Sequence, residues 1–119
     1  MIIITKDTKN KIFEISSSED FLIVITKSSE INLQFKLLKE NVAAHVYGVV
    51  SITGNDEATL NIKTLHLSPN ANSRVHIKSV LKDNAKFNFE GLIDIAKEAQ
   101  LSDAYLQNDN LVIGDNAVV

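Results

Sequence analysis

Apolar residues alternate with polar ones along most of the chain, in short runs separated by turn-forming residues. This alternation has the period of a β-strand, and it predicts strands over residues 11–15, 21–26, 30–38, 43–53, 58–68, 74–81, 86–95 and 105–113. The gaps between the runs are rich in Ser, Gly, Asn, Asp and Pro, as at residues 16–18, 54–56 and 69–72. Residues 94–101 resemble a single helical turn, and we interpret them as a loop. The pattern predicts an all-β protein.

The later strands also repeat one another when four small residues are superposed: Gly48, Thr64, Ser79 and Gly91. Two and four positions before the small residue stand apolar side chains that we expect to point inward: Val46, Ile62, Ile77 and Phe89, and Ala44, Leu60, Val75 and Phe87. The residue directly after it is apolar as well: Val49, Leu65, Val80 and Leu92. We expect this last column to point inward too, which requires each strand to bend at the small residue.

Repeated strand units without intervening helices are typical of a β-solenoid, in which successive coils stack in register. If two units make one turn, the alternation places His45 above His76 and Asn61 above Asn88, on the outward face. An antiparallel β-sandwich with turns at similar spacing is the alternative that periodicity leaves open.

Length, charge and cysteine content narrow the functional classes. The 119 residues suffice for one domain, residues 1–119. Lys and Arg number 12 against 15 Asp and Glu, a net charge of −3, so we expect no nucleic-acid partner. The chain has no cysteine, which excludes disulfides and thiolate ligands from its own residues. Without a leader or an apolar stretch near the ~20 residues of a membrane-spanning helix, we expect a cytoplasmic protein that contacts no membrane.

The second half of the chain resembles the SufB/SufD family of iron–sulfur cluster assembly proteins, most closely SufD. The resemblance rests on four pieces in the family's order and spacing: Ser73 and Arg74 before a strand, then Phe89 and Gly91, then Ala99, Gln100, Asp103 and Ala104, then Asn108, Asn110 and Leu111. It is strong from residue 73 to 119, fainter from 31 to 72 and absent from the first thirty. The chain departs from the family at Tyr105, where Gln is common, and at Gln107, where Thr is usual.

The resemblance implies a right-handed parallel β-helix, here of about four to five turns. It also implies work in a complex with SufB-like or SufD-like chains and a SufC-type ATPase that builds or transfers clusters. The family's Cys- and His-containing segment follows the strand that corresponds to Leu111–Ile113, and this sequence ends at Val119 before it. We therefore carry over no catalytic or metal-binding residue, and we expect the chain alone to bind no cofactor, meeting a cluster only through the complex.

Polar side chains offer weaker leads. His45 and His76, one coil apart, are candidate metal ligands, but solvent-facing positions along a ladder are the simpler interpretation. Glu90 and Asp94 are expected to be solvated outward charges. Arg74, the only arginine, is expected to form a salt bridge with Asp56 or Glu57. Asn108, Asn110 and Asn116 could form amide ladders, although turn positions are the more common use of Asn in such folds.

The last segment predicts an interface. Leu111, Val112, Ile113, Val118 and Val119 lie where the family places a further coil, and an uncapped coil invites strand addition, so we expect a homodimer through the end coils. The leading hypothesis is a non-catalytic SufB/SufD-like scaffold or partner protein in iron–sulfur cluster assembly, either a shortened relative or a core fragment. A stand-alone β-solenoid binding module is the second hypothesis, and a small cupin-like metal protein that uses His45, His66 and His76 is the third.

Overall fold

The computed structural model describes residues 1–5, 8–99, 101–114 and 116–119. Nine strands follow one another along the described chain: β1 (Ile2–Ile4), β2 (Asn10–Ile15), β3 (Glu19–Ile25), β4 (Ser29–Leu37), β5 (Ala43–Ile52), β6 (Glu57–His66), β7 (Asn72–Lys82), β8 (Lys86–Ile95) and β9 (Asp103–Ile113). The eight strands predicted from the alternation are confirmed to within about two residues at each end. β1 was not predicted, because three consecutive isoleucines show no alternation.

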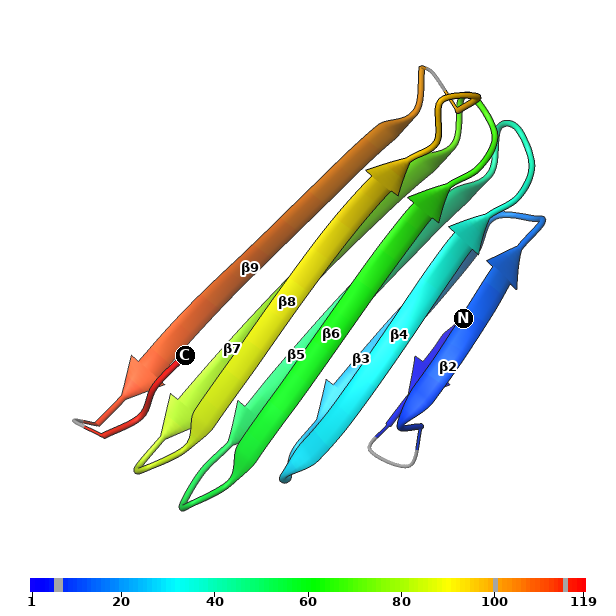
Figure 1. Ribbon diagram of the computed structural model, residues 1–119. Helices are drawn as coiled ribbons and strands as arrows, with labels where there is room; N and C mark the ends of the chain where they lie inside the picture. Colours follow the sequence, from blue (N-terminus) through cyan, green and yellow to red (C-terminus); the bar gives the residue numbers. More distant parts are fainter. Residues whose placement is uncertain (6–7, 100, 115) are drawn as a thin grey trace.

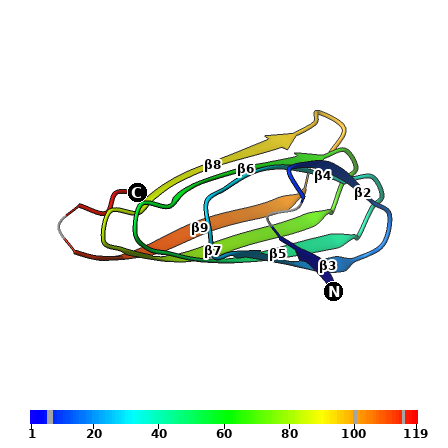
Figure 2. The same ribbon diagram turned by 90° about the horizontal axis from the view of Figure 1, so that it is seen from below.

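The strands form two parallel sheets that face each other (Figures 1 and 2). Odd-numbered strands make one sheet in the order β1-β3-β5-β7-β9, and even-numbered strands make the other in the order β2-β4-β6-β8. The chain runs along one sheet, crosses, returns along the other and advances one strand, as a right-handed coil (Figure 1). The parallel β-helix is confirmed and the antiparallel sandwich was wrong. Each coil contributes one strand to each sheet, so β1 to β8 make four coils and β9 begins a fifth.

The core lies between the two sheets and consists of the alternate residues of each strand. β4 illustrates this pattern, because Ile31, Leu33, Phe35 and Leu37 are buried while the residues between them are partly exposed. Near the first coils Phe35 stacks on Phe13 at 5.3 Å between ring centroids, and Phe21 of the opposite sheet meets Phe35 edge to face at 4.8 Å. Burying such side chains contributes about 1.5–3 kcal/mol each, so hydrophobic burial holds the two sheets together.

The bend predicted after each small residue does not occur, and that prediction was wrong. Inside and outside alternate without interruption through β5 to β7, so the small residue points inward and the apolar residue after it points outward. Val49, Leu65, Val80 and Leu92 are therefore surface residues of the sheets rather than core residues. The small residue admits a bulky neighbour instead, since a Cβ atom on Gly48 would lie 2.4 Å from Cδ1 of Ile77 on the next coil.

The stacking partners lie two residues from the predicted positions. His45 pairs with Arg74, and Tyr47 pairs with His76. In the other sheet Asn61 pairs with Glu90, and Thr59 pairs with Asn88. The prediction placed these residues on the correct outward face but in the wrong register, because a shift of two residues preserves the side-chain direction and alternation cannot detect it. The middle coils advance 29 residues per turn, as between Asn32 and Asn61.

The turns stack as regularly as the strands do. Where the chain passes from the four-stranded to the five-stranded sheet, Asn41, Asn70 and Leu101 occupy one position in successive coils, and all three have a left-handed backbone with φ of 62°, 58° and 68°. At the opposite turns Gly54 and Asp83 are likewise left-handed, and Asp83 accepts a hydrogen bond from the Thr53 hydroxyl at 2.7 Å. Residues 96–99 form a turn, so the interpretation of 94–101 as a loop is confirmed for 96–99 and 101, whereas Asp94 and Ile95 still belong to β8.

Replacement of Leu101 by asparagine is expected to stabilise the protein. Leu101 is 84% exposed and has a left-handed backbone that asparagine adopts more readily, as it does at the two equivalent positions. Leu101→Asn should raise the free energy of unfolding in urea by about 1 kcal/mol. Asn70→Leu is the matched control and should lower it by a similar amount; unchanged stability in both variants would contradict the explanation.

Candidate interaction site at the C-terminal coil

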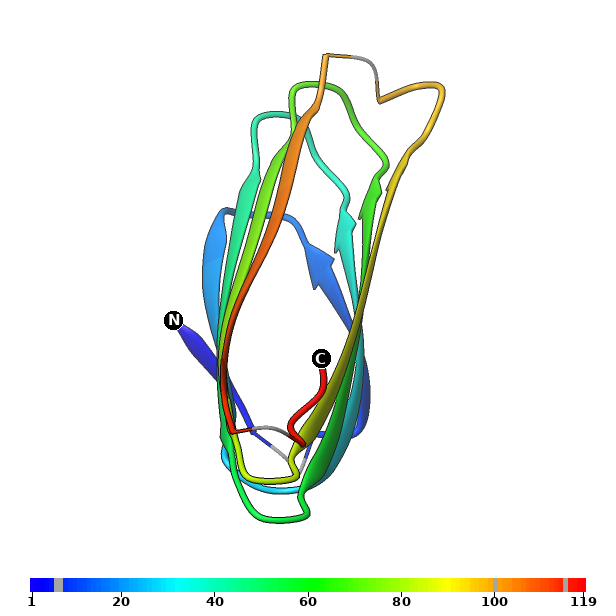
Figure 3. The same cartoon turned by 90° about the vertical axis from the view of Figure 1, so that its left-hand side faces the viewer.

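The C-terminal end of the solenoid is formed by β8 and β9, the outermost strands of the two sheets (Figures 1 and 3). After β9 the chain turns back toward β8, where Val118 pairs with Lys86 as a parallel bridge. Val118 donates to the carbonyl of Ala85 at 3.0 Å and accepts from the amide of Phe87 at 2.9 Å. Among the described residues, β9 has a strand partner on the β7 side alone, so its other edge presents backbone donors and acceptors.

The five predicted interface residues are all exposed at this end: Leu111, Val112, Ile113, Val118 and Val119. They do not form one flat surface. Register with β7 places Val112 over buried Leu81 on the inner face, whereas Leu111 and Ile113 lie on the outer face of the sheet. A strand added at the β9 edge would contact both sets, because its side chains would also alternate between the two faces.

Two asparagines of the same strand point into the solenoid. Asn108 stacks on Ile77 and Asn110 on Ser79, whose hydroxyl donates a hydrogen bond to the Asn110 side chain. The Oδ1 atom of Asn108 is buried and has no hydrogen-bond partner among the described residues. Turn positions were therefore the wrong prediction for Asn108 and Asn110, while Asn116 lies exposed beyond the strand. The unsatisfied amide is a polar group that another coil stacked on β9 would be able to pair.

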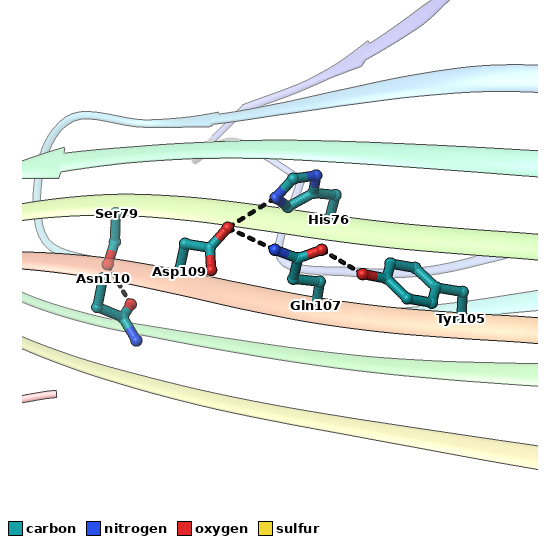
Figure 4. A network of polar contacts seen from close by, with 6 residues as sticks. All are labelled: His76, Ser79, Tyr105, Gln107, Asp109 and Asn110. Carbon is teal, nitrogen blue, oxygen red and sulfur yellow. Dashed lines mark hydrogen bonds and ion pairs between the residues drawn. The ribbon is translucent and has the colours of Figure 1, made fainter.

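A chain of hydrogen bonds covers the outer face of β9 (Figure 4). The Tyr105 hydroxyl donates to Gln107, the Gln107 amide donates to Asp109 at 2.8 Å, and the Asp109 carboxylate lies 3.0 Å from Nε2 of His76 on β7. The hydrogen bond with His76, supported by that of Gln107, holds the pKa of Asp109 below its usual range. Tyr105 and Gln107 thus belong to one local network with Asp109 and His76.

Arg74 does not form the predicted salt bridge. Its guanidinium lies 6.0 Å from the ring centroid of Tyr105, in a cation–π contact. Asp56 instead accepts a hydrogen bond from Ser28, and Glu57 pairs with Lys86 at 3.8 Å. The prediction failed because Arg74 lies on a face of the five-stranded sheet, whereas the two acidic residues lie at a turn that leads into the other sheet.

The three histidines lie apart, which contradicts a metal site that uses all of them. His45 and His76 are on the outer face of the five-stranded sheet, each beside its own carboxylate, Asp20 at 3.6 Å and Asp109 at 3.0 Å. His66 is buried inside the coil, with Nε2 2.8 Å from the Ser73 hydroxyl. Within the described ranges no three His, Cys, Asp or Glu side chains cluster as metal ligands. The cupin-like hypothesis was wrong in fold and in geometry.

The remaining motif residues build the last coil. Ser73 is buried beside His66, Phe89 and Gly91 lie on the inner side of β8, Ala99 is buried in the turn, and Asp103 and Ala104 begin β9. A Cβ atom on Gly91 would lie 2.6 Å from Cδ2 of Leu106 on the opposite sheet, so glycine permits that close approach. Gln100 lies outside the described residues. Glu90 and Asp94 are on the outer face, as expected.

The two stacked parallel sheets with an open edge at β9 define a parallel β-helix. Comparison with known families makes this specific. Residues 12–119 match the model of the family "SUF system FeS cluster assembly, SufBD core domain", and the chain belongs to this family. The match includes residues 12–30, so the expectation that the first thirty residues lack the resemblance was wrong. Residues 1–11 lie outside it.

One curated relative is an iron–sulfur cluster assembly SufBD family protein of Synechocystis sp., which is 26% identical over 81 residues. The aligned region covers 68% of this chain and 17% of the relative, so the chain spans a small part of that protein. No solved structure matches the chain. Within the described residues no helix is long and apolar enough to cross a membrane.

The hydrogen-bond chain on β9 and the inward direction of the Asn108 side chain were not predicted from the sequence. The spacing of Tyr105, Gln107 and Asp109 at every second residue was an available signal, because such residues share one face of a strand. Contact between Asp109 and His76 could not be found in this way, since it requires the register between β7 and β9.

Acidification is expected to destabilise the protein through His66. Burial lowers the pKa of His66 because desolvation penalises the charged imidazolium, and the Ala71 backbone and the charge of Asp103 oppose this shift only in part. The unfolded chain therefore takes up the proton first, and the free energy of unfolding should fall as the pH drops from about 6.5 toward the lower pKa of the folded state.

The variant His66→Leu with Ser73→Ala should lose this pH dependence while remaining folded, since Leu37 occupies the equivalent position one coil earlier. The Ser73 substitution removes the hydroxyl that would lose its partner. Urea unfolding between pH 7 and pH 5 measures the effect, and His45→Leu, at an exposed histidine, is the control that should keep the dependence. An unaltered slope in the double variant would contradict the assignment to His66.

Proposed function

We propose that the chain is a single SufB/SufD-like domain, closest to SufD, that acts as a non-catalytic scaffold or partner in cytoplasmic iron–sulfur cluster assembly. The observation that supports this proposal best is the open edge of β9, with an unsatisfied Asn108 amide on one face and exposed Leu111 and Ile113 on the other. Membership of the SufBD core family supports a role in iron–sulfur cluster assembly. The open edge of β9 supports contact with another chain through strand addition.

The partners we propose are SufB-like or SufD-like chains, in a complex with a SufC-type ATPase, or a second copy of this chain. A strand laid against β9 would pair its backbone groups and cover the end of the core at once. In a two-fold contact between two β9 edges, the unpaired backbone groups of each copy would pair with those of the other. A homodimer is therefore the simplest assembly. The chain contributes no thiolate, so a cluster would be the cargo of the complex rather than a resident group of this chain.

Self-association through the β9 edge is expected to depend on its apolar residues. Leu111→Lys with Ile113→Lys places two charges beside the added strand and should weaken dimerisation at least tenfold, as measured by gel filtration and sedimentation velocity over a wide concentration range. Ile12→Lys is the matched control, because Ile12 is similarly exposed on β2 at the other end of the solenoid. A wild-type protein whose dimerisation is unaffected by the β9 substitutions would contradict the homodimer.

Association with the assembly machinery is tested by co-expression with a SufB-like chain and a SufC-type ATPase. We expect the wild-type chain to be captured with both proteins and the Leu111→Lys, Ile113→Lys variant to be lost from the complex, while Ile12→Lys is retained. Elemental analysis of the isolated chain should find no stoichiometric iron. Failure of the wild type to join either protein, or iron bound tightly to the chain alone, would contradict the proposed role.

A further inference from the structure

The outer face of the five-stranded sheet carries an apolar patch near its N-terminal end. β3 is apolar on both faces: Phe21, Ile23 and Ile25 are buried, and Leu22 and Val24 between them point outward. Their neighbours on the same face are Ile3 of β1 and Tyr47 and Val49 of β5, which are 64%, 44% and 49% exposed. We call Ile3, Leu22, Val24, Tyr47 and Val49 the β3–β5 patch.

The patch ends abruptly on the same face. The next strand, β7, places Arg74, His76 and Lys78 in the corresponding outward positions. The outer face of the opposite sheet is mainly polar, and there Asn32 donates to Asn10 at 3.0 Å while Asn61 donates to Asn32 at 2.7 Å. A parallel strand that is apolar on both faces is typical of a sheet covered on both sides. The β3–β5 patch is thus a local apolar feature of an otherwise polar surface.

One carboxylate–imidazole pair borders the patch. Asp20 of β3 and His45 of β5 lie side by side, with the Asp20 carboxylate 3.6 Å from Nδ1 of His45, and the His45 ring meets Tyr47 edge to face at 6.5 Å between centroids. A shallow hollow opens beside the pair, lined by Ser18, Glu19, Asp20, Ala43 and His45. The border therefore offers an acid, an imidazole and a recess next to the apolar residues.

These residues are self-complementary. β3 and β5 are neighbours, and their register sets Asp20 beside His45, Leu22 beside Tyr47 and Val24 beside Val49. A two-fold axis parallel to the strands, above the sheet and midway between β3 and β5, would lay each β3 over the β5 of a second copy. Leu22 would then meet Tyr47 of the second copy, Val24 would meet Val49, and each Asp20 would face His45. Ile3, on β1, would face His76 of β7 at the edge of the contact.

We propose that the β3–β5 patch is a face-to-face dimerisation surface for a second copy of this chain. The placement of carboxylate against imidazole favours a second copy of this chain, because the arrangement that covers the outward apolar residues of β3 and β5 also brings Asp20 opposite His45 twice. The interface is isologous and closes on itself, so it produces dimers without further growth.

The size of the patch indicates a weak dimer. The axis would overlay four strands, β1, β3, β5 and β7, and strands about 4.8 Å apart with about six residues at ~3.3 Å each give a flat footprint of roughly 400 Å² per copy. Stable interfaces bury about 800 Å² per partner, and smaller ones are typical of transient contacts. A dissociation constant in the micromolar range is therefore expected.

This inference goes beyond the proposed function and uses none of the residues at the β9 edge. The test is made in the Leu111→Lys, Ile113→Lys background, in which association through the end coil is disabled. Sedimentation equilibrium of that protein should still detect a micromolar dimer. Val49→Lys should weaken this dimer at least tenfold, and Ile12→Lys, on the polar sheet, should leave it unchanged.

A charge exchange tests whether a second copy of this chain binds the β3–β5 patch, and its result does not depend on the stability of any one variant. In the same background, Asp20→Lys alone and His45→Glu alone should each dimerise poorly, because each loses both acid–imidazole contacts across the axis. Mixing the two should restore a heterodimer, in which the introduced lysine of one chain faces the introduced glutamate of the other. Circular dichroism of each variant checks that the fold is retained.

Two results would overturn the proposal. The first is a monomer at all concentrations in the end-coil variant background, which would leave the patch to a different kind of partner. The second is a dimer that is indifferent to Val49→Lys and to the charge exchange. Loss of the end-coil dimer alone bears on the proposed function and leaves this inference standing.

Discussion

Parallel stacking of the backbone governs this molecule, because every coil must present its strands in register to the coils on either side. Backbone hydrogen bonds between coils fix the spacing, and side chains at equivalent positions are forced into contact. The side chain that fits at each position therefore depends on the side chains at the same position in the coils above and below, as glycine at position 48 leaves room for Ile77. The same constraint extends to the turns of the later coils, where left-handed residues occupy equivalent positions in successive coils.

The stacking also explains why the functional features lie at the margins. Inside the solenoid, each strand edge is paired and each inner face is covered, so middle coils have little left to offer a partner. The end coil has an unpaired strand edge and a buried Asn108 Oδ1 atom that has no hydrogen-bond partner among the described residues. β3 has apolar side chains on its outer face as well as on its inner face. Both surfaces are suited in their chemistry to contact with another protein chain.

Much of the fold could be read from the sequence. Alternation located eight strands, and the absence of helical periodicity together with the spacing indicated a solenoid. Register was beyond this reasoning, because a slip of two residues keeps every side chain on its predicted face, and so His45 was placed over His76 rather than Arg74. The N-terminal coil also escaped recognition because it advances 22 residues, from Asn10 to Asn32, rather than the 29 of the middle coils. The site was predicted as a set of exposed apolar residues, while the inward amide and the hydrogen bonds to His76 needed the register that the sequence does not supply.

The repeated left-handed turns make the length of the protein adjustable in whole steps. A duplicated coil would bring its own Asn or Gly at the turn and its own inward side chains, and it would lengthen the molecule by about 4.8 Å without altering either terminus. Two surfaces carried by such a protein can thus be moved apart by fixed increments. Spacing between bound partners becomes a property that gene duplication can tune, independently of the affinity of each contact.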